Sequence, residues 1–248
     1  MTKNRAKSDE RSRRLRERIG LKIPVRVLGR DSVDAEWTEM ARLVDVTPLG
    51  ARLRLKRPTE PGRLLHLIMA MPRQLRAFDH AEDQYRVWAL VRNLKLLAPD
   101  ADALVEIGVA FVGKRPPKSL ASDPTRRYEI GSSDAGLWTV QEESEEVLSE
   151  IFVSDKRKVT RHTIPVDVLI QVFDVNGELG QSERTVTENI SSLGAAVFTT
   201  LDVSPGRFVK LSSEQYRTSV LGVVRRRRTG ADNIPRLHVE FVGGEWPL

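Results

Sequence analysis

The feature that most constrains the fold of this 248-residue chain is an internal repeat. Four segments of its first half recur in the second half in the same order. The matched pairs are IPVRVL (23–28) with IPVDVL (164–169), DVTPLGARL (45–53) with NISSLGAAV (189–197), EPGRLLHL (60–67) with SPGRFVKL (204–211), and VEIGVAFVG (105–113) with LHVEFVG (237–243). Repetition in order predicts that one fold occurs twice, as two related domains.

The spacing of the matched segments locates an insertion in the first copy. The offset between partners is 141 residues at the first pair, 144 at the second and 130 at the last. The first copy therefore holds extra residues before its last matched segment, and we place them within 72–86.

The repeated segments have the pattern of short strands. In IPVDVLIQV, Val166, Val168 and Ile170 alternate onto one face. Short apolar segments separated by turn signals are typical of a small antiparallel barrel or sandwich. The Asn-Gly pair in DVNGE (174–178) predicts a hairpin, and the Pro-Gly pairs in 60–63 and 204–207 predict type II turns.

A segment rich in Pro, Ser and Gly separates the two copies. It leads into TVQEESEEVLSEIF (139–152), whose apolar residues lie near helical spacing with Glu opposite, so we expect a short acidic amphipathic helix there. The expected domains are a basic flexible arm (1–18), a first domain (19–115), a linker with the acidic helix (116–153) and a second domain (154–248).

Charge and composition restrict the classes of function. A net charge of +6 and a pI near 9.8 suit an anionic partner. No apolar run approaches the ~20 residues that span a bilayer, and the N-terminus has no apolar signal region. We therefore expect a cytoplasmic protein without membrane insertion.

No catalytic or metal-binding motif is present in the sequence. The absence of cysteine excludes disulfides and thiolate chemistry, and no phosphate-binding loop or nucleophile elbow occurs. The histidines are scattered without metal-ligand spacing, and we interpret His66 and His238 as residues at the edge of the core. We expect no enzyme activity, no metal and no resident cofactor.

Two polar features of the second copy point to an anionic ligand. In NISSLG (189–194), Asn and Ser favour a tight turn, and Gly lets another molecule approach the backbone. Upstream, Arg157 and Arg161 lie four residues apart, and guanidinium groups bind phosphate or the guanine edge with two parallel hydrogen bonds. Each feature alone has an ordinary interpretation, a loop or a solvated basic face. Together they indicate a binding site.

The pattern R-x-x-x-R, here RKVTR (157–161), followed by [D/N]-x-S-x-x-G, here NISSLG, resembles the PilZ domain family. The resemblance covers roughly 14–113 and 155–243. It implies an all-β fold with a minor helix, in which two tandem six-stranded antiparallel β-barrels are joined by a linker and a short helix. It also implies binding of cyclic di-GMP.

The resemblance assigns roles to residues of the second copy. It implies that Arg157 and Arg161 wrap the guanine and phosphate groups of the ligand. Asn189, Ser191 and Gly194 are expected to line the opposite wall. Lys156 stands where many family members carry a further Arg, so the number of ligand molecules at the site, one or two, stays open.

The first copy departs from the pattern. DVTPLG keeps Asp45, Thr47 and Gly50. Counting back from the prolines of the matched IPV segments, Arg16 takes the place of Arg157, while Gly20 takes the place of Arg161. Arg14 and Arg18 form R-x-x-x-R two residues upstream. We expect a first domain that acts structurally and binds ligand weakly or not at all.

The leading hypothesis is a non-enzymatic receptor that relays binding by domain rearrangement to an unidentified protein effector. Two alternatives stay open. One is a ligand-free adaptor in which both copies serve protein contacts. The other is a basic nucleic-acid-binding barrel, with the arm and Arg225–Arg228 following phosphates, although aromatic residues are not interleaved with the basic ones.

Overall fold

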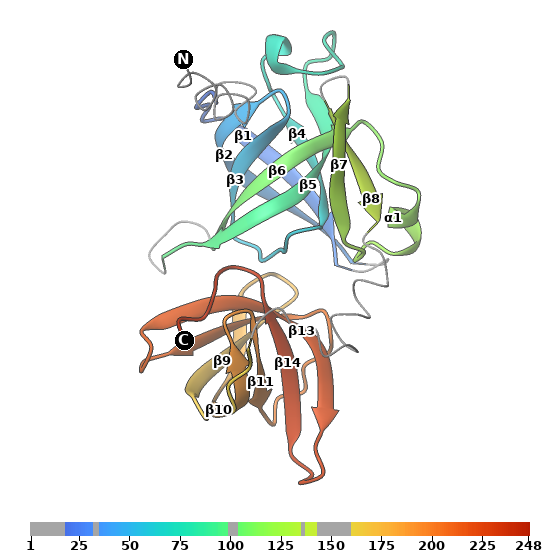
Figure 1. Ribbon diagram of the computed structural model, residues 1–248. Coiled ribbons are helices and arrows are strands. Elements are labelled where there is room, and N and C mark those ends of the chain that lie inside the picture. Colours follow the sequence, from blue (N-terminus) through green and yellow to red (C-terminus); the bar gives the residue numbers. More distant parts are fainter. Residues whose placement is uncertain (1–17, 32–34, 99–103, 135–136, 143–159) are drawn as a thin grey trace, which may run out of the picture.

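Two closed six-stranded antiparallel barrels, one above the other, make up the computed structural model (Figure 1). The structure describes residues 18–31, 35–98, 104–134, 137–142 and 160–248. The expected fold class, two tandem six-stranded antiparallel barrels with a minor helix, is confirmed. The expected basic arm lies outside the described residues except for its last residue.

The two barrels have the same strand order. Barrel 1 runs in the order β1-β2-β3-β6-β5-β4 and barrel 2 in the order β10-β11-β14-β13-β12-β9. Barrel 1 comprises β1 (Pro24–Arg30), β2 (Glu36–Thr47), β3 (Gly50–Leu55), β4 (Leu64–Met69), β5 (Tyr85–Leu96) and β6 (Val105–Gly113). Barrel 2 comprises β9 (Asp167–Phe173), β10 (Leu179–Ser191), β11 (Gly194–Phe198), β12 (Phe208–Ser213), β13 (Thr218–Thr229) and β14 (Pro235–Phe241). The repeat in the sequence is thus a repeat of topology.

Alternation along the strands explains the cores. Inward-facing residues such as Val27 and Leu67 in barrel 1, and Ile170 and Leu211 in barrel 2, are fully buried. Their neighbours in sequence point outward, because successive side chains of a strand face opposite sides. Each barrel therefore has a packed apolar interior, and polar side chains that could bind a ligand lie on its outer surface.

The predicted turns are found where the sequence places them. The Asn-Gly turn joins β9 to β10, with Gly177 at φ +82°. Gly62 and Gly206 of the two Pro-Gly pairs adopt φ of +90° and +88°. These values suit the third position of a type II turn, which favours glycine because a Cβ is strained there.

The extra residues of the first copy lie mainly where they were predicted. Fifteen residues, 70–84, join β4 to β5 and include the short 3-10 helix η1 (Arg73–Leu75), whereas four residues, 214–217, join β12 to β13. The buried guanidinium of Arg76 holds this loop together by donating to the backbone carbonyls of Met71, Asp79, Glu82 and Asp83.

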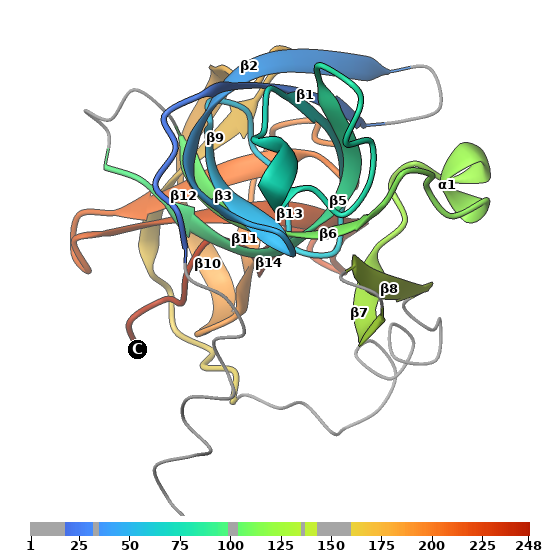
Figure 2. The ribbon, with the colours of Figure 1, turned by 90° about the horizontal axis from the view of Figure 1, so that it is seen from above.

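The segment after barrel 1 differs from the expected linker. It forms the four-residue helix α1 (Ser119–Ser122) and a hairpin of β7 (Tyr128–Asp134) and β8 (Leu137–Glu142), beside barrel 1 in Figures 1 and 2. Residues 139–142 of the predicted helix 139–152 are therefore strand, because they pair with β7. The remainder of that helix lies outside the described residues. Tyr128 packs against Leu64, Leu90 and Leu120, which attaches the hairpin to barrel 1.

Apolar contact joins the two barrels. Phe173 and Leu221 of barrel 2 belong to the buried cluster of barrel 1, and Phe208 packs against that cluster. Val220 belongs to the core of barrel 2, so the next residue, Leu221, faces the outside of that barrel. Leu221 is nevertheless fully buried, because it packs into the cluster of barrel 1. Burial of such side chains disfavours separation of the barrels.

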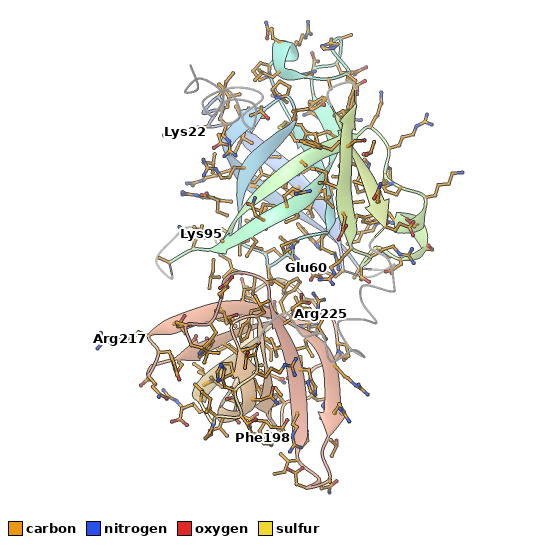
Figure 3. The ribbon with its side chains drawn as sticks, viewed as in Figure 1. Lys22, Glu60, Lys95, Phe198, Arg217 and Arg225 are labelled. Atoms are coloured by element: carbon orange, nitrogen blue, oxygen red, sulfur yellow. The ribbon has the colours of Figure 1, made fainter. Side chains whose placement is uncertain are left out.

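A buried ion-pair group lies at the same interface. Glu60, in the Pro-Gly turn of barrel 1, is 3% exposed and accepts hydrogen bonds from Arg225 of β13 (Figure 3). Arg225 also donates to Glu240 at 2.6 Å. Burial alone lowers the pKa of Arg225, but the two carboxylates more than offset it and raise the pKa. A buried carboxylate without such partners is unfavourable, so this group helps to set how the barrels meet.

The matched core positions Leu67 and Leu211 provide a test of the repeat. Both are fully buried, so replacing either by Ala leaves a cavity that should cost about 2–5 kcal/mol of unfolding free energy. We expect losses in this range from Leu67→Ala and Leu211→Ala, measured by urea denaturation. Met40→Ala, at a 60% exposed position, is the control and should change stability by less than about 0.5 kcal/mol.

Candidate functional site

The segment that leads into barrel 2 is fastened to β10. Thr187 donates from Oγ1 to the carbonyl of Ile164 at 2.9 Å and accepts from the N–H of Val166 at 3.0 Å. Further upstream, His162 and Ile190 exchange backbone hydrogen bonds of 2.8 and 3.0 Å. This pairing brings Arg161 alongside the end of β10, where the NISSLG turn begins.

The turn itself is closed by its own polar residues. The Ser191 hydroxyl donates to the carbonyl of Gly194 at 3.2 Å, as Thr47 does to Gly50 in barrel 1 at 3.3 Å. A Cβ on Gly194 would lie 2.6 Å from the carbonyl oxygen of Val239 in β14. The space that Gly194 leaves is thus filled by the backbone of the neighbouring strand, and the glycine is required for the barrel to close there.

Four residues form a row across the outer surface of barrel 2. Cross-strand pairing places Asn189 beside Ala196, Ala196 beside His238, and His238 beside Arg226. Their sequence neighbours Ile190, Val197 and Leu237 belong to the core, so the row faces outward. We call these four residues, together with Arg161, the motif face.

The motif face is electropositive. His238 is half-buried, and its pKa lies below the ordinary value because of burial and then because of Arg161, Arg228 and Arg226. Adding a proton to the imidazole would place another positive charge beside three guanidinium groups. Glu188 opposes this shift, but its carboxylate also accepts a hydrogen bond from Arg236 at 2.7 Å. A face of this charge favours anions.

Asn189 contributes an unsatisfied acceptor to the motif face. Its Oδ1 is buried and has no hydrogen-bond partner among the described residues. A buried polar atom without a partner costs about 1–3 kcal/mol, so an external donor that reached it would be bound favourably.

The corresponding register of barrel 1 identifies the counterpart of Arg161. Ile19 pairs with Val46 as His162 pairs with Ile190. Arg18 is therefore the counterpart of Arg161, two residues upstream of Gly20, the position obtained by counting from the prolines. In this register Arg14, and not Arg16, corresponds to Arg157. Both Arg14 and Arg16 lie outside the described residues.

The equivalent row of barrel 1 is occupied by its own charges. Asp45, Arg52, Gly108 and Asn93 take the places of Asn189, Ala196, His238 and Arg226. Arg52 donates from Nε to Asp45 at 2.9 Å and from Nη1 to Glu106 at 3.4 Å, and Arg18 lies 3.7 Å from Asp45. Here carboxylates pair with the arginines, whereas barrel 2 has an amide, Asn189, and a methyl group, Ala196, at the corresponding positions.

The run Arg225–Arg228 is divided by a β-bulge. The pairing of β13 with β14 shifts between Val224 and Arg226, which leaves Arg225 as the extra residue. Arg225 turns to Glu60 and Glu240 at the interface, while Arg226 pairs with His238 on the motif face. One strand thus contributes neighbouring residues to the motif face and to the contact between the barrels.

Sequence reasoning found part of this arrangement. Asn189, Ser191 and Gly194 lie on one turn with Arg161 beside it, as the motif predicts, while Arg157 and Lys156 lie outside the described residues. Ala196 and Arg226 were not singled out individually, and His238 was interpreted as a core-edge residue. Comparing the repeats position by position would have indicated Ala196 and His238, because GAR becomes GAA and IGV becomes LHV.

Two further properties concern the described part of the chain alone. It holds no group of three or more His, Asp or Glu residues able to bind a metal ion. None of its helices is long and apolar enough to cross a bilayer.

Comparison with known proteins gives similar solved structures but no family. No protein-family model matches the sequence, and no curated protein matches it significantly. The motility inhibitor MotI/DgrA of Bacillus subtilis is 14% identical over 91% of this chain and 90% of its own, with a TM-score of 0.30. PlzA of Borreliella burgdorferi, solved with c-di-GMP, is 10% identical over 97% and 93%, with a TM-score of 0.30. YcgR of Escherichia coli, also solved with c-di-GMP, is 11% identical over 89% and 76%, with a TM-score of 0.29. We therefore argue function from the residues of this chain.

The close approach of β14 to Gly194 leads to a stability test. Gly194→Ala should destabilise barrel 2 by about 1–3 kcal/mol, because the new methyl group overlaps a backbone carbonyl that has no room to move. Gly180→Ala is the matched control, since its Cβ would make an ordinary contact at 3.6 Å. Thermal unfolding of the two variants compares them, and equal melting temperatures would contradict the proposed overlap.

The electropositive character of the motif face is measurable through His238. We expect NMR titration to give a His238 pKa below 6.5, and Arg226→Ala to raise it because one repelling charge is removed. His66 is the internal control. Its pKa is lowered by burial and by Arg86, so it should not respond to Arg226→Ala. An unchanged His238 pKa in this variant would mean that the arginines do not act on the imidazole.

Proposed function

We propose that this protein is a cytoplasmic, non-enzymatic receptor that binds cyclic di-GMP through barrel 2, a PilZ-like domain. The observation that carries the proposal is the electropositive motif face, on which Arg161 lies beside the unsatisfied acceptor of Asn189. Cyclic di-GMP combines two phosphate charges with two guanine bases, so it presents anionic groups and hydrogen-bond donors together.

Each group of the motif face matches a part of this ligand. The Asn189 Oδ1 is a suitable acceptor for the N1–H or the N2 amino group of guanine. Arg161 and Arg157 supply planar donor pairs for phosphate oxygens or for the guanine O6 and N7 atoms. Ser191 and Gly194 shape the turn that presents Asn189, and Lys156 adds a further cation near the pair.

His238 and Ala196 extend the site beyond the sequence motif. Ala196 is fully buried on the outer face, and its single methyl group leaves the centre of the row free of a long side chain. The lowered pKa of His238 keeps its imidazole neutral near pH 7, with one donor and one acceptor nitrogen. A neutral ring provides a surface for a base, while Arg226 supplies the charge.

Barrel 1 is assigned a structural role. Asp45, the counterpart of Asn189, is paired with Arg52 and approached by Arg18. An anion entering this row would compete with a carboxylate for both guanidinium groups. We therefore expect one binding barrel in each chain, and the possible weak site at Asp45, Thr47 and Gly50 is not favoured.

The bulge in β13 offers a route from ligand to output. A ligand that draws Arg226 towards its phosphate shifts the strand at Arg225, whose side chain joins Glu60 of barrel 1. A ligand changes an arrangement only by binding one state better than the other. In this relay, the ligand-bound protein favours one geometry of the Arg225–Glu60 contact. A protein effector then binds that arrangement of the barrels.

Substitution of Arg161 tests the proposal. Arg161→Ala should weaken cyclic di-GMP binding by about 10- to 100-fold, because one charge-assisted contact is worth about 1.5–3 kcal/mol. Arg157→Ala should act in the same direction. The matched control is Arg18→Ala at the equivalent position of barrel 1, which should leave affinity unchanged. Isothermal titration calorimetry, with GTP and cyclic GMP as competing nucleotides, gives affinity and stoichiometry together.

The outcomes separate this proposal from its alternatives. Unchanged affinity in both barrel 2 variants, or no binding by the unmodified chain, would remove the receptor function and leave the ligand-free adaptor. Tight binding of single-stranded DNA at physiological salt, lost when Arg226 and Arg228 are replaced by Ala, would instead support the nucleic-acid function.

A further inference from the structure

A cleft lies between the barrels, away from the motif face. Its volume is about 1100 Å³, which is in the range of sites for ligands of a few hundred daltons or more. Barrel 1 contributes Lys56, Leu96 and Leu104, and barrel 2 contributes Lys210 and Arg217 from β12 and the turn that follows it. In Figure 3 the labels of Lys95 and Arg217 mark this side of the molecule. None of the residues of the motif face lines it.

The walls of this cleft carry unneutralised positive charge. Lys56, Lys210 and Arg217 form no ion pair with any residue that the structure describes. A fourth cation, Arg184, lies 3.3 Å from Glu214, and both of these side chains are strongly exposed. Asp167 is the other acidic residue of the lining. Cations approaching from both barrels without paired carboxylates favour an anionic occupant.

The cleft also has an apolar wall. Leu96 ends β5, Leu104 directly precedes β6, and both are only partly buried against the core of barrel 1. On the side of barrel 2, Leu179 is 43% exposed. Burial of such lining leucines against an apolar group that displaces water is favourable.

An unsatisfied hydroxyl belongs to the same lining. Ser213, at the end of β12, is 5% exposed, and its Oγ has no hydrogen-bond partner among the described residues. Buried hydroxyls are nearly always paired, so an orphan next to a cavity indicates a partner that enters from the cavity.

We propose that this cleft binds an amphipathic anion, a molecule with one carboxylate or phosphate group and an apolar body. Lys56, Lys210 and Arg217 pair with the anionic group, and the leucines receive the apolar part. The site joins both barrels, so its occupant favours the arrangement in which they are in contact. It is separate from the motif face: β10 contributes to both, but Leu179 and Arg184 line the cleft whereas Asn189 lies on the motif face.

Decanoate and decyl phosphate are the probes, with decanol as the neutral molecule of equal chain length. Each is titrated against the full chain carrying the fluorescent anion 1-anilinonaphthalene-8-sulfonate. We expect both anions to displace one dye per chain, and decanol to bind at least about tenfold more weakly because it lacks the charge. The two anions distinguish a carboxylate ligand from a phosphate one.

Two sets of variants locate the site. The double variant Lys56→Ala/Lys210→Ala should weaken binding of the anions by about tenfold or more. Lys95→Ala is the matched control, since this lysine precedes Leu96 but does not line the cleft. Ser213→Ala removes the unpaired hydroxyl, so it should preserve or raise the melting temperature of the free protein. The same variant should bind the anions more weakly.

Specific results overturn the proposal. Failure of both anions to displace the dye would do so, as would equal affinity in the double variant and in Lys95→Ala. Equal binding of decanol and decanoate would show a merely apolar groove. Cyclic di-GMP affinity, measured in the same double variant, should be unchanged, so a failure of this site and a failure of the motif face are distinguishable.

Discussion

The structure depends on main-chain hydrogen bonding between strands that are distant in sequence. In barrel 1, β1 pairs with β4, and in barrel 2, β9 pairs with β12. These contacts close the sheet of each barrel on itself, so the strands of the two barrels form no open sheet edge that a partner could extend. Closure directs alternate side chains into a small interior. All remaining chemistry must then lie on the outer surfaces or between the barrels, and both candidate sites are found there.

The two barrels share one fold but differ in the charges on the outer row of residues. A few outer positions differ: Asp45 against Asn189, Arg52 against Ala196, and Gly108 against His238. In barrel 1 the charged residues pair with one another, since Arg52 donates hydrogen bonds to Asp45 and Glu106. In barrel 2 the acid becomes an amide and the long cation a methyl group, so the row has no carboxylate at the position that corresponds to Asp45. The repeated fold thus carries a row of paired charges in barrel 1 and a buried unpaired acceptor beside cationic residues in barrel 2.

Much of the fold follows from the sequence because it depends on local chemistry. Alternating apolar residues indicated the strands, and the Asn-Gly and Pro-Gly pairs indicated their turns. The insertion followed from the change in offset. What failed depended on partners far along the chain. Residues 139–142 have helical spacing, yet they form a strand because β7 lies beside them, and tertiary pairing overrides a short local preference.

The candidate site was predictable in its motif and not in its surroundings. Register decides which arginine of barrel 1 matches Arg161, and a backbone bridge at Ile19, not the distance to a proline, sets that register. His238 gave no signal by itself, since a histidine in an apolar strand is ordinary. Its environment arises only when β10, β11, β13 and β14 lie side by side.

The bulge in β13 has a consequence for the whole surface. Side chains of a strand alternate, and the bulge lets β13 hold one additional residue without exchanging inside and outside beyond it: Val224 pairs with Val239, and Arg226 pairs with His238, the residue before Val239. Without the bulge, continued regular pairing would place Arg225 beside His238 and turn Arg226 to the side of Leu237, although the sequence would be unchanged. The pattern of charge on barrel 2 therefore depends on the register of this strand, and the same sequence paired without the bulge would present a different face.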